Sequence, residues 1–168
     1  AHIGVHAVRV VIHSDDRELY DRAVSGLRLL EPVTGGSTRQ DSVRLGLESL
    51  AGSAYDTVLI HDGARPFVDS GTITRIITNL LKSPGAIPAL PVHDTLKVAA
   101  VTDSVRWVES TVERQNLWQA QTPQGFHFSH ILAAHRAAAS NALTDDAAVA
   151  ERAGLQVQLV VGSGENCK

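Results

Sequence analysis

The sequence has 168 residues, a formal net charge of −3, and 43% hydrophobic residues of which few are aromatic. This length is typical of one globular domain, and 15 basic against 18 acidic residues exclude an electrostatic binder of nucleic acid. The one cysteine, Cys167, excludes a scaffold built on internal disulfides, and the apolar runs are too short to span a bilayer. The composition predicts a cytoplasmic α/β domain that acts without a membrane or a nucleic acid.

Strand and helix patterns alternate along the chain. We expect strands at residues 7–13, 32–34, 57–60, 86–92 and 157–161, and helices at residues 14–25, 39–50, 70–82, 129–139 and 145–153. This alternation predicts βαβ units with right-handed crossovers and a doubly wound sheet. Proline cannot donate to a strand ladder, so Pro88 and Pro91 predict an edge, a bulge or an irregular exit for their strand.

Residues 94–113 alternate apolar and polar side chains without a helical stripe, which predicts a hairpin-like arm. An arm of about twenty residues is long for a compact domain, and such segments are often functional or dock on a partner chain. A solvated hairpin explains the pattern equally well. Because no linker or repeat interrupts the sequence, residues 1–168 are expected to form one domain that contains this arm.

Two polar segments follow predicted strands, where open α/β sheets bind their ligands. Gly35 and Gly36 open onto a helix, where free N–H groups suit an anion or a nucleobase edge, although an ordinary turn is equally consistent. Asp62 and Arg65 follow the central strand. This carboxylate could hold Mg²⁺ and this guanidinium could bind a phosphate, and the alternative is an Asp–Arg pair that only fixes the loop.

Further polar residues lie at the base of the arm and near the end of the chain. Thr144 precedes two aspartates, and the plain interpretation of this group as a helix N-cap is favoured. Lys168 follows the last strand, where it could reach a phosphate or belong to a solvated tail. The eight histidines show no HExxH spacing and no G-x-S-x-G motif is present, so a zinc site and a serine hydrolase are both improbable.

Six motifs occur in one order that resembles the 2-C-methyl-D-erythritol 4-phosphate cytidylyltransferase family. They are Gly35-Gly36-x-x-Arg39-x-x-Ser42, Asp62-Gly63-Ala64-Arg65-Pro66, Pro91-Val92-x-Asp94-Thr95-x-Lys97, Arg114-x-x-Leu117-Trp118-x-x-Gln121-Thr122-Pro123-Gln124, Thr144-Asp145-Asp146-Ala147 and Asn166-Cys167-Lys168. The resemblance covers essentially the whole chain. The chain also resembles the cytidylyltransferase half of bifunctional proteins that carry a 2,4-cyclodiphosphate synthase.

The resemblance implies a Rossmann-like nucleotidyltransferase fold, with a doubly wound, mostly parallel sheet and a protruding β-arm. The implied reaction transfers a cytidylyl group from CTP to 2-C-methyl-D-erythritol 4-phosphate, with Mg²⁺ as cofactor. Its products are 4-diphosphocytidyl-2-C-methyl-D-erythritol and pyrophosphate, in non-mevalonate isoprenoid biosynthesis. The arm of this family crosses to a second subunit, so a homodimer is also implied.

The resemblance also assigns roles to individual residues. Nucleotide contacts are implied for Gly35, Gly36, Ser37, Ser42 and Gly63, the metal for Asp62, and catalysis for Asp62, Arg114 and Lys168. Substrate contacts are implied for Arg65, Thr95, Arg114, Thr122, Thr144 and Lys168. Among these, Thr95, Arg114 and Thr122 would complete the site of the partner subunit.

The start of the chain departs from the family. The sequence contains no Met and lacks the glycine-rich loop whose Arg and Lys grip the triphosphate in this family. We therefore expect that a segment of roughly fifty residues precedes Ala1, and that the chain alone is a poor enzyme. Two alternatives stay open: an inert dimerisation or phosphosugar-binding fragment, and a nucleotidyltransferase that uses another nucleotide.

Overall fold

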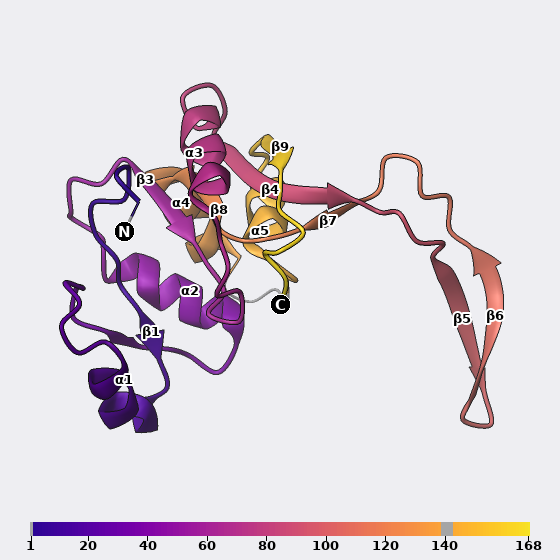
Figure 1. Ribbon diagram of the computed structural model, residues 1–168, viewed down its shortest axis with the longest axis horizontal. Helices are drawn as coiled ribbons and strands as arrows, with labels where there is room; N and C mark the ends of the chain where they lie inside the picture. Colours follow the sequence, from indigo (N-terminus) through magenta and orange to yellow (C-terminus); the bar gives the residue numbers. More distant parts are fainter. Residues whose placement is uncertain (1, 139–142) are drawn as a thin grey trace.

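A computed structural model describes residues 2–138 and 143–168, and it shows an α/β fold with an extended arm (Figure 1). The elements, in chain order, are β1 (Val11–Ile12), a 3₁₀ turn (Ser14–Asp16), α1 (Arg17–Ala23), β2 (Val33–Thr34), α2 (Arg39–Glu48), β3 (Thr57–Ile60), α3 (Ser70–Asn79), β4 (Gly85–Pro91), β5 (Lys97–Thr102), β6 (Val105–Thr111), β7 (Trp118–Ala120), β8 (Gln124–His127), α4 (Phe128–Ala137), α5 (Asp146–Arg152) and β9 (Val157–Val161). No described helix is long and apolar enough to cross a membrane.

The main sheet has five strands and is mixed. Strands β3, β8, β4 and β7 lie in that order, and β9 pairs with the other side of β4. The strands β3, β4 and β9 run in one direction, whereas β8 and β7 run against them. A parallel pair, β1 and β2, forms a separate small sheet. The Rossmann-like α/β class is confirmed, but the antiparallel β8 between β3 and β4 makes most ladders of the main sheet antiparallel, against the expectation of a mostly parallel sheet.

Strand β4 lies at the centre of the sheet although it contains Pro88 and Pro91. Of the three expected alternatives, an edge position is therefore wrong, whereas an irregularity in the strand pairing is present. One side of β4 pairs with β9, and the other side pairs first with β8 and then with β7. The carbonyl of Pro88 accepts from the amide of Gln121, so its ring nitrogen faces the same side, where the ladder changes partner. A missing N–H is tolerated there because no continuous ladder needs it.

Helices cover both faces of the main sheet, as a doubly wound fold requires. On one face, α2, α4 and α5 enclose a core that includes Ile87 and Phe126, and on the other face α3 packs Ile76 and Leu80 against Ala86. Neighbouring residues of β4 thus serve opposite cores, as strand geometry demands. Helix α3 approaches β8 so closely that a Cβ on Gly125 would lie 2.4 Å from the Cγ2 of Ile76. Glycine is required at this contact.

The expected arm is confirmed as a hairpin of β5 and β6, which extends away from the rest of the molecule (Figure 1). Asp103 and Ser104 form its two-residue turn, and their φ angles of 51° and 65° have the sign that suits a tight hairpin. Its apolar side chains are exposed, among them Val101 at 67%, Trp107 at 61% and Val108 at 68%. The hairpin therefore adds little to the core of its own chain.

An apolar cleft lies between the small sheet of β1 and β2 and the main sheet. This apolar cleft has a volume of about 670 Å³ and lies between residues 4–11, helix α2 and strand β3. At its rim the cleft borders Arg39 and Asp62, which also belong to the polar cavity described next.

Candidate active site

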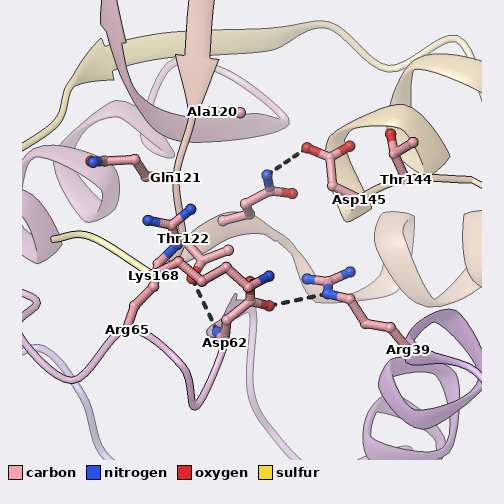
Figure 2. Close-up of a pocket in the computed structure, with 10 residues that line it drawn as sticks. Arg39, Asp62, Arg65, Ala120, Gln121, Thr122, Thr144, Asp145 and Lys168 are labelled. Atoms are coloured by element: carbon pink, nitrogen blue, oxygen red, sulfur yellow. Dashed lines mark hydrogen bonds and ion pairs between the residues drawn. The ribbon is translucent and has the colours of Figure 1, made fainter. Parts of the chain in front are cut away.

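A small polar cavity of about 150 Å³ lies where several elements of the fold end (Figure 2). Asp62 and Arg65 follow β3, Gln121 and Thr122 follow β7, Thr144 precedes α5, and Lys168 follows β9. The residues that line the cavity are Arg39, Asp62, Arg65, Ala120, Gln121, Thr122, Gln124, Thr144, Asp145 and Lys168. Five residues that sequence motifs singled out separately, Asp62, Arg65, Thr122, Thr144 and Lys168, thus share one hollow.

Asp62 is the carboxylate at the centre of this cavity. Its Oδ1 accepts from Arg39 Nε at 3.0 Å and its Oδ2 accepts from Lys168 Nζ at 3.0 Å. Its backbone amide donates to the hydroxyl of Thr122 (Figure 2). Partial burial acts to raise the pKa of Asp62, but the hydrogen bonds from Lys168 and Arg39 outweigh burial and lower it. The carboxylate is therefore ionised near neutral pH.

Arg39 connects the cavity to the protein interior. Its Nε binds Asp62, and its Nη2 donates to Asp146 Oδ2 at 2.7 Å. Burial acts to lower the pKa of Arg39, whereas the charges and hydrogen bonds of Asp146 and Asp62 raise it, and the net change is upward. The sequence motif contains Arg39, but sequence reasoning gave this residue no role, because only the fold shows that it joins two carboxylates.

The C-terminal loop that carries Lys168 is fastened at three points. Arg65 donates to the carbonyl of Asn166 at 2.6 Å, and Gln121 donates to the carbonyl of Ser163 at 2.8 Å. The buried Asn166 donates in turn to the carbonyl of Thr122. An Asp62–Arg65 pair, the alternative that the sequence left open, is not formed, because Asp62 pairs with Arg39 and Lys168 instead.

The segment around Thr144 is a helix cap, as the plain interpretation predicts. The cap is Asp145, whose Oδ1 accepts from the amide of Ala148 at 2.9 Å. Its Oδ2 accepts from the side-chain amide of Gln124, whose Oε1 accepts from the backbone amide of Ala147. Thr144 nevertheless lines the cavity, so the same turn both begins α5 and borders the candidate site.

The polar cavity is not lined by the residues for which nucleotide contacts near the start of α2 are predicted, Gly35, Gly36, Ser37 and Ser42. At the start of α2, Thr38 caps the helix and Ser42 Oγ accepts from the amide of Gly36 at 3.1 Å. A Cβ on Gly36 would lie 2.4 Å from the Cβ of Asp41, so only glycine fits. Ser42, together with Gly63, lines the neighbouring apolar cleft, whereas Gly35, Gly36 and Ser37 line neither hollow. Nucleotide contacts by these residues stay a prediction.

The predicted arm residues are also separate from the cavity of their own chain. Thr95 and Arg114 lie near the base of the arm and are not among the lining residues. The guanidinium of Arg114 donates to the carbonyl of His93. Thr122, which the resemblance groups with the partner's residues, instead lines the cavity of its own chain beside Asp62. Thr122 therefore needs no crossing arm to reach this site.

Two carboxylates line the cavity, and Asp62 is the one available to a divalent metal, because Asp145 accepts from Gln124 and from the amide of Ala148. Within residues 2–138 and 143–168, no group of three or more His, Cys, Asp or Glu side chains is arranged to hold a metal ion. Mg²⁺ commonly keeps several waters and binds one or two carboxylates together with substrate phosphates. Asp62, ionised and facing a polar cavity, fits that mode of binding, although a site made of protein ligands alone is not formed by these residues.

The lowered pKa values of Asp62 and Asp69 predict acid sensitivity. Burial acts to raise the pKa of Asp62, but hydrogen bonds from Lys168 and Arg39 lower it. Hydrogen bonds from the hydroxyl and the backbone amide of Thr72 lower the pKa of Asp69. A carboxyl group whose pKa is lower in the folded than in the unfolded state stabilises the fold at pH values above its unfolded pKa of 3.8. This stabilisation is lost as the pH falls through the folded-state pKa. Urea unfolding should give a free energy of unfolding that decreases as the pH falls below about 4, where these two carboxylates become protonated. An increase below pH 4 would contradict these assignments.

The cavity combines three cationic side chains, two hydroxyls and the central carboxylate of Asp62 within a Rossmann-like fold, and this fold and kind of site are typical of the nucleotidyltransferase class. The sequence matches the family of 2-C-methyl-D-erythritol 4-phosphate cytidylyltransferase, IspD, over residues 1–168. The chain belongs to this family.

Curated relatives and solved structures agree with this membership. The chain is 60% identical to the bifunctional enzyme IspD/IspF of Paramagnetospirillum magneticum over 98% of its own length, and 57% identical to that of Rhodospirillum rubrum over its full length. It spans 42% and 43% of those two relatives. The cytidylyltransferase structure from Thermus thermophilus matches with a TM-score of 0.78 and 31% identity, covering 98% of this chain and 76% of that one. A crystal structure of 4-diphosphocytidyl-2C-methyl-D-erythritol synthase gives a TM-score of 0.85 and 32% identity over 99% of this chain and 76% of that one.

Proposed function

We propose that this chain carries the site at which a cytidylyl group passes from CTP to 2-C-methyl-D-erythritol 4-phosphate. The observation that carries the proposal is the meeting of Arg65, Lys168 and Thr144 around the ionised carboxylate of Asp62 in one cavity. Such a site suits two polyanionic reactants, because its cations offset their mutual repulsion. Family membership supplies the identity of the two reactants.

The proposed reaction is an in-line displacement. A phosphate oxygen of the acceptor attacks the α-phosphorus of CTP, a new P–O bond forms, and the bond to the β-phosphate breaks so that pyrophosphate leaves with its electron pair. The attacking oxygen is already ionised near neutral pH, so no side chain has to remove a proton. The work of this chain is therefore to position the two reactants and neutralise their charge, and Lys168 and Arg65 carry the positive charges that suit this task.

Asp62 is the residue that would hold Mg²⁺, and a bound Mg²⁺ would neutralise phosphate charge and polarise the α-phosphate. Lys168 now donates to Asp62, and its side chain is 57% exposed, so it is free to turn toward a phosphate. Arg39 would stay in place, because the buried Asp146 holds its other end. The site thus has one movable cation and one fixed cation beside the same carboxylate.

A preference for CTP should reveal the role of the segment from Gly36 to Ser42. We expect release of pyrophosphate to be at least about tenfold faster with CTP than with UTP, GTP or ATP, since a wrong base leaves buried polar groups unpaired. The Gly36→Ala variant should lose this preference, because its Cβ would collide with Asp41. The matched control is Gly164→Ala, where an added Cβ meets nothing within 4 Å.

The two open alternatives give other results in the same assay. Equal rates with all four nucleotides would favour a transferase that uses another donor. Failure to release pyrophosphate, both by this chain and by a longer chain that contains the family's glycine-rich loop, would favour an inert dimerisation or phosphosugar-binding fragment.

We further propose that the chain acts in the cytoplasm as a homodimer, in which Thr95 and Arg114 reach the cavity of the partner subunit. The exposed apolar side chains of β5 and β6, including Val101 and Trp107, support this arrangement, because such surfaces are usually covered by a partner. The arm also extends away from the rest of its own chain (Figure 1), and Thr95 and Arg114 at its base do not line the cavity of that chain.

A further inference from the structure

Beneath the cavity lies a pair of buried ionisable side chains, His135 and Asp146. Both side chains are essentially inaccessible to solvent, and His135 Nε2 lies 3.1 Å from Asp146 Oδ1. His135 belongs to α4 and Asp146 is the first residue of α5, and α4 packs against both α5 and α2. The pair therefore sits where the three helices that carry Arg39, His135 and Asp146 come together.

The hydrogen bonds fix which atoms donate. Asp146 accepts from Arg39 at Oδ2, so it behaves as a carboxylate, and a carboxylate can only accept from His135. The imidazole must therefore carry its proton on Nε2. Its Nδ1 is buried without a hydrogen-bond partner among the described residues. Nε2 of His135 thus donates to Oδ1 of Asp146, and Oδ2 of Asp146 is left to accept from Arg39.

A continuous series of contacts leads from this pair to the cavity. His135 donates to Asp146, Asp146 accepts from Arg39 at 2.7 Å, and Arg39 Nε donates to Asp62 at 3.0 Å. Arg39 is shared by two carboxylates, one buried and one in the cavity. Without the donor on His135, Asp146 would satisfy its second oxygen from the guanidinium as well, and Arg39 would be drawn away from Asp62.

Stability alone is a weak reason for such an arrangement. Apolar side chains of similar size often replace a buried ionic group with no loss of stability, because taking charges out of water is costly. The surrounding core, which includes Ile131 and Val149, is apolar and would accept them. A requirement to fix the guanidinium beside the cavity explains why polar groups occupy this place.

We propose that His135 and Asp146 are positioning residues that hold Arg39, and through it Asp62, in the geometry needed for cytidylyl transfer. This inference rests on the proposed function. Neither residue lines the cavity, so neither is expected to touch a reactant. Their effect should appear in kcat and in the dependence of the rate on Mg²⁺, whereas KM for the acceptor should change little.

The test compares three substitutions of His135. The His135→Gln variant places an amide N–H near the position of Nε2 and should keep kcat within about threefold of the unmodified protein. The variants His135→Asn, whose shorter amide does not reach Asp146, and His135→Leu should lower kcat about tenfold and raise the Mg²⁺ concentration needed for half the maximal rate. The matched control is Ile131→Val in the same buried helix face, which should alter Tm without altering kcat.

A second measurement keeps the test independent of turnover. The Nε–H signal of Arg39, followed by ¹⁵N NMR, should shift in the Asn and Leu variants and stay in place in the Gln variant. Equal kcat in the Gln, Asn and Leu variants, or an unchanged Arg39 signal in all of them, would overturn the positioning role. If the unmodified protein transferred no cytidylyl group, the proposed function would fail, while the Arg39 signal would still decide whether His135 holds the guanidinium.

Discussion

The Asp62→Asn variant should transfer the cytidylyl group about a thousandfold more slowly than the unmodified protein while remaining folded. Asparagine keeps the shape of the side chain but removes the charge that Arg39 and Lys168 now share. It also removes the carboxylate proposed to hold Mg²⁺, so two contributions to charge neutralisation are lost together. Release of pyrophosphate at saturating CTP measures the rate, and thermal unfolding checks the fold.

The matched control for this variant is Asp56→Asn, since Asp56 is an exposed aspartate at the other end of β3. We expect its rate to stay within about twofold, because a surface charge far from the cavity contributes little. A rate for Asp62→Asn above about a tenth of the unmodified rate would show that this carboxylate is not central to the reaction.

Mixing two inactive variants should restore activity if the arm completes the partner's site. Arg114→Ala and Lys168→Ala are each expected to lower the rate at least a hundredfold, because each removes a charged group proposed to bind the reactants. After subunit exchange, half of the dimers are mixed and each mixed dimer has one intact site of two, so about a quarter of the activity should return. The rate of pyrophosphate release before and after mixing measures the recovery.

The structure supplies an internal control for this experiment. Thr122 and Lys168 line the cavity of the same chain, so a mixture of Thr122→Ala and Lys168→Ala has no intact site and should stay inactive. No recovery with Arg114→Ala, in samples where exchange is demonstrated, would argue against a crossing arm. Recovery in both mixtures would contradict the position of Thr122 beside Asp62.

Local sequence patterns predicted those parts of the fold that depend on neighbours in the chain. The segment expected as a strand at 157–161 is strand β9, and the alternating segment 94–113 contains the hairpin of β5 and β6. The pattern missed β8, because Gln124–His127 is short and contains a glycine that only the contact with α3 explains. The prolines of β4 left an edge, a bulge or an irregular exit open, since nothing local reveals that the strand changes partner beside Pro88.

The candidate site shows the same division. Asp62 and Lys168 could be singled out because each follows a predicted strand, and the fold brings them within hydrogen-bonding distance. The sequence showed Arg39 only as one residue of a motif, and His135 as one of eight scattered histidines. Their roles depend on contacts between helices that are distant in the sequence, so no spacing rule could have found these residues.

The hairpin described above has a consequence for how the molecule unfolds. In the described chain β5 and β6 form a sheet of two strands with no third neighbour, and a lone hairpin of this kind is marginal in water. In the proposed homodimer, the order of the hairpin should therefore depend on the concentration of subunits: at high dilution the amides of 97–111 should exchange their hydrogens with solvent long before those of the central strands do. Hydrogen exchange of the hairpin would then report the fraction of chains that have associated.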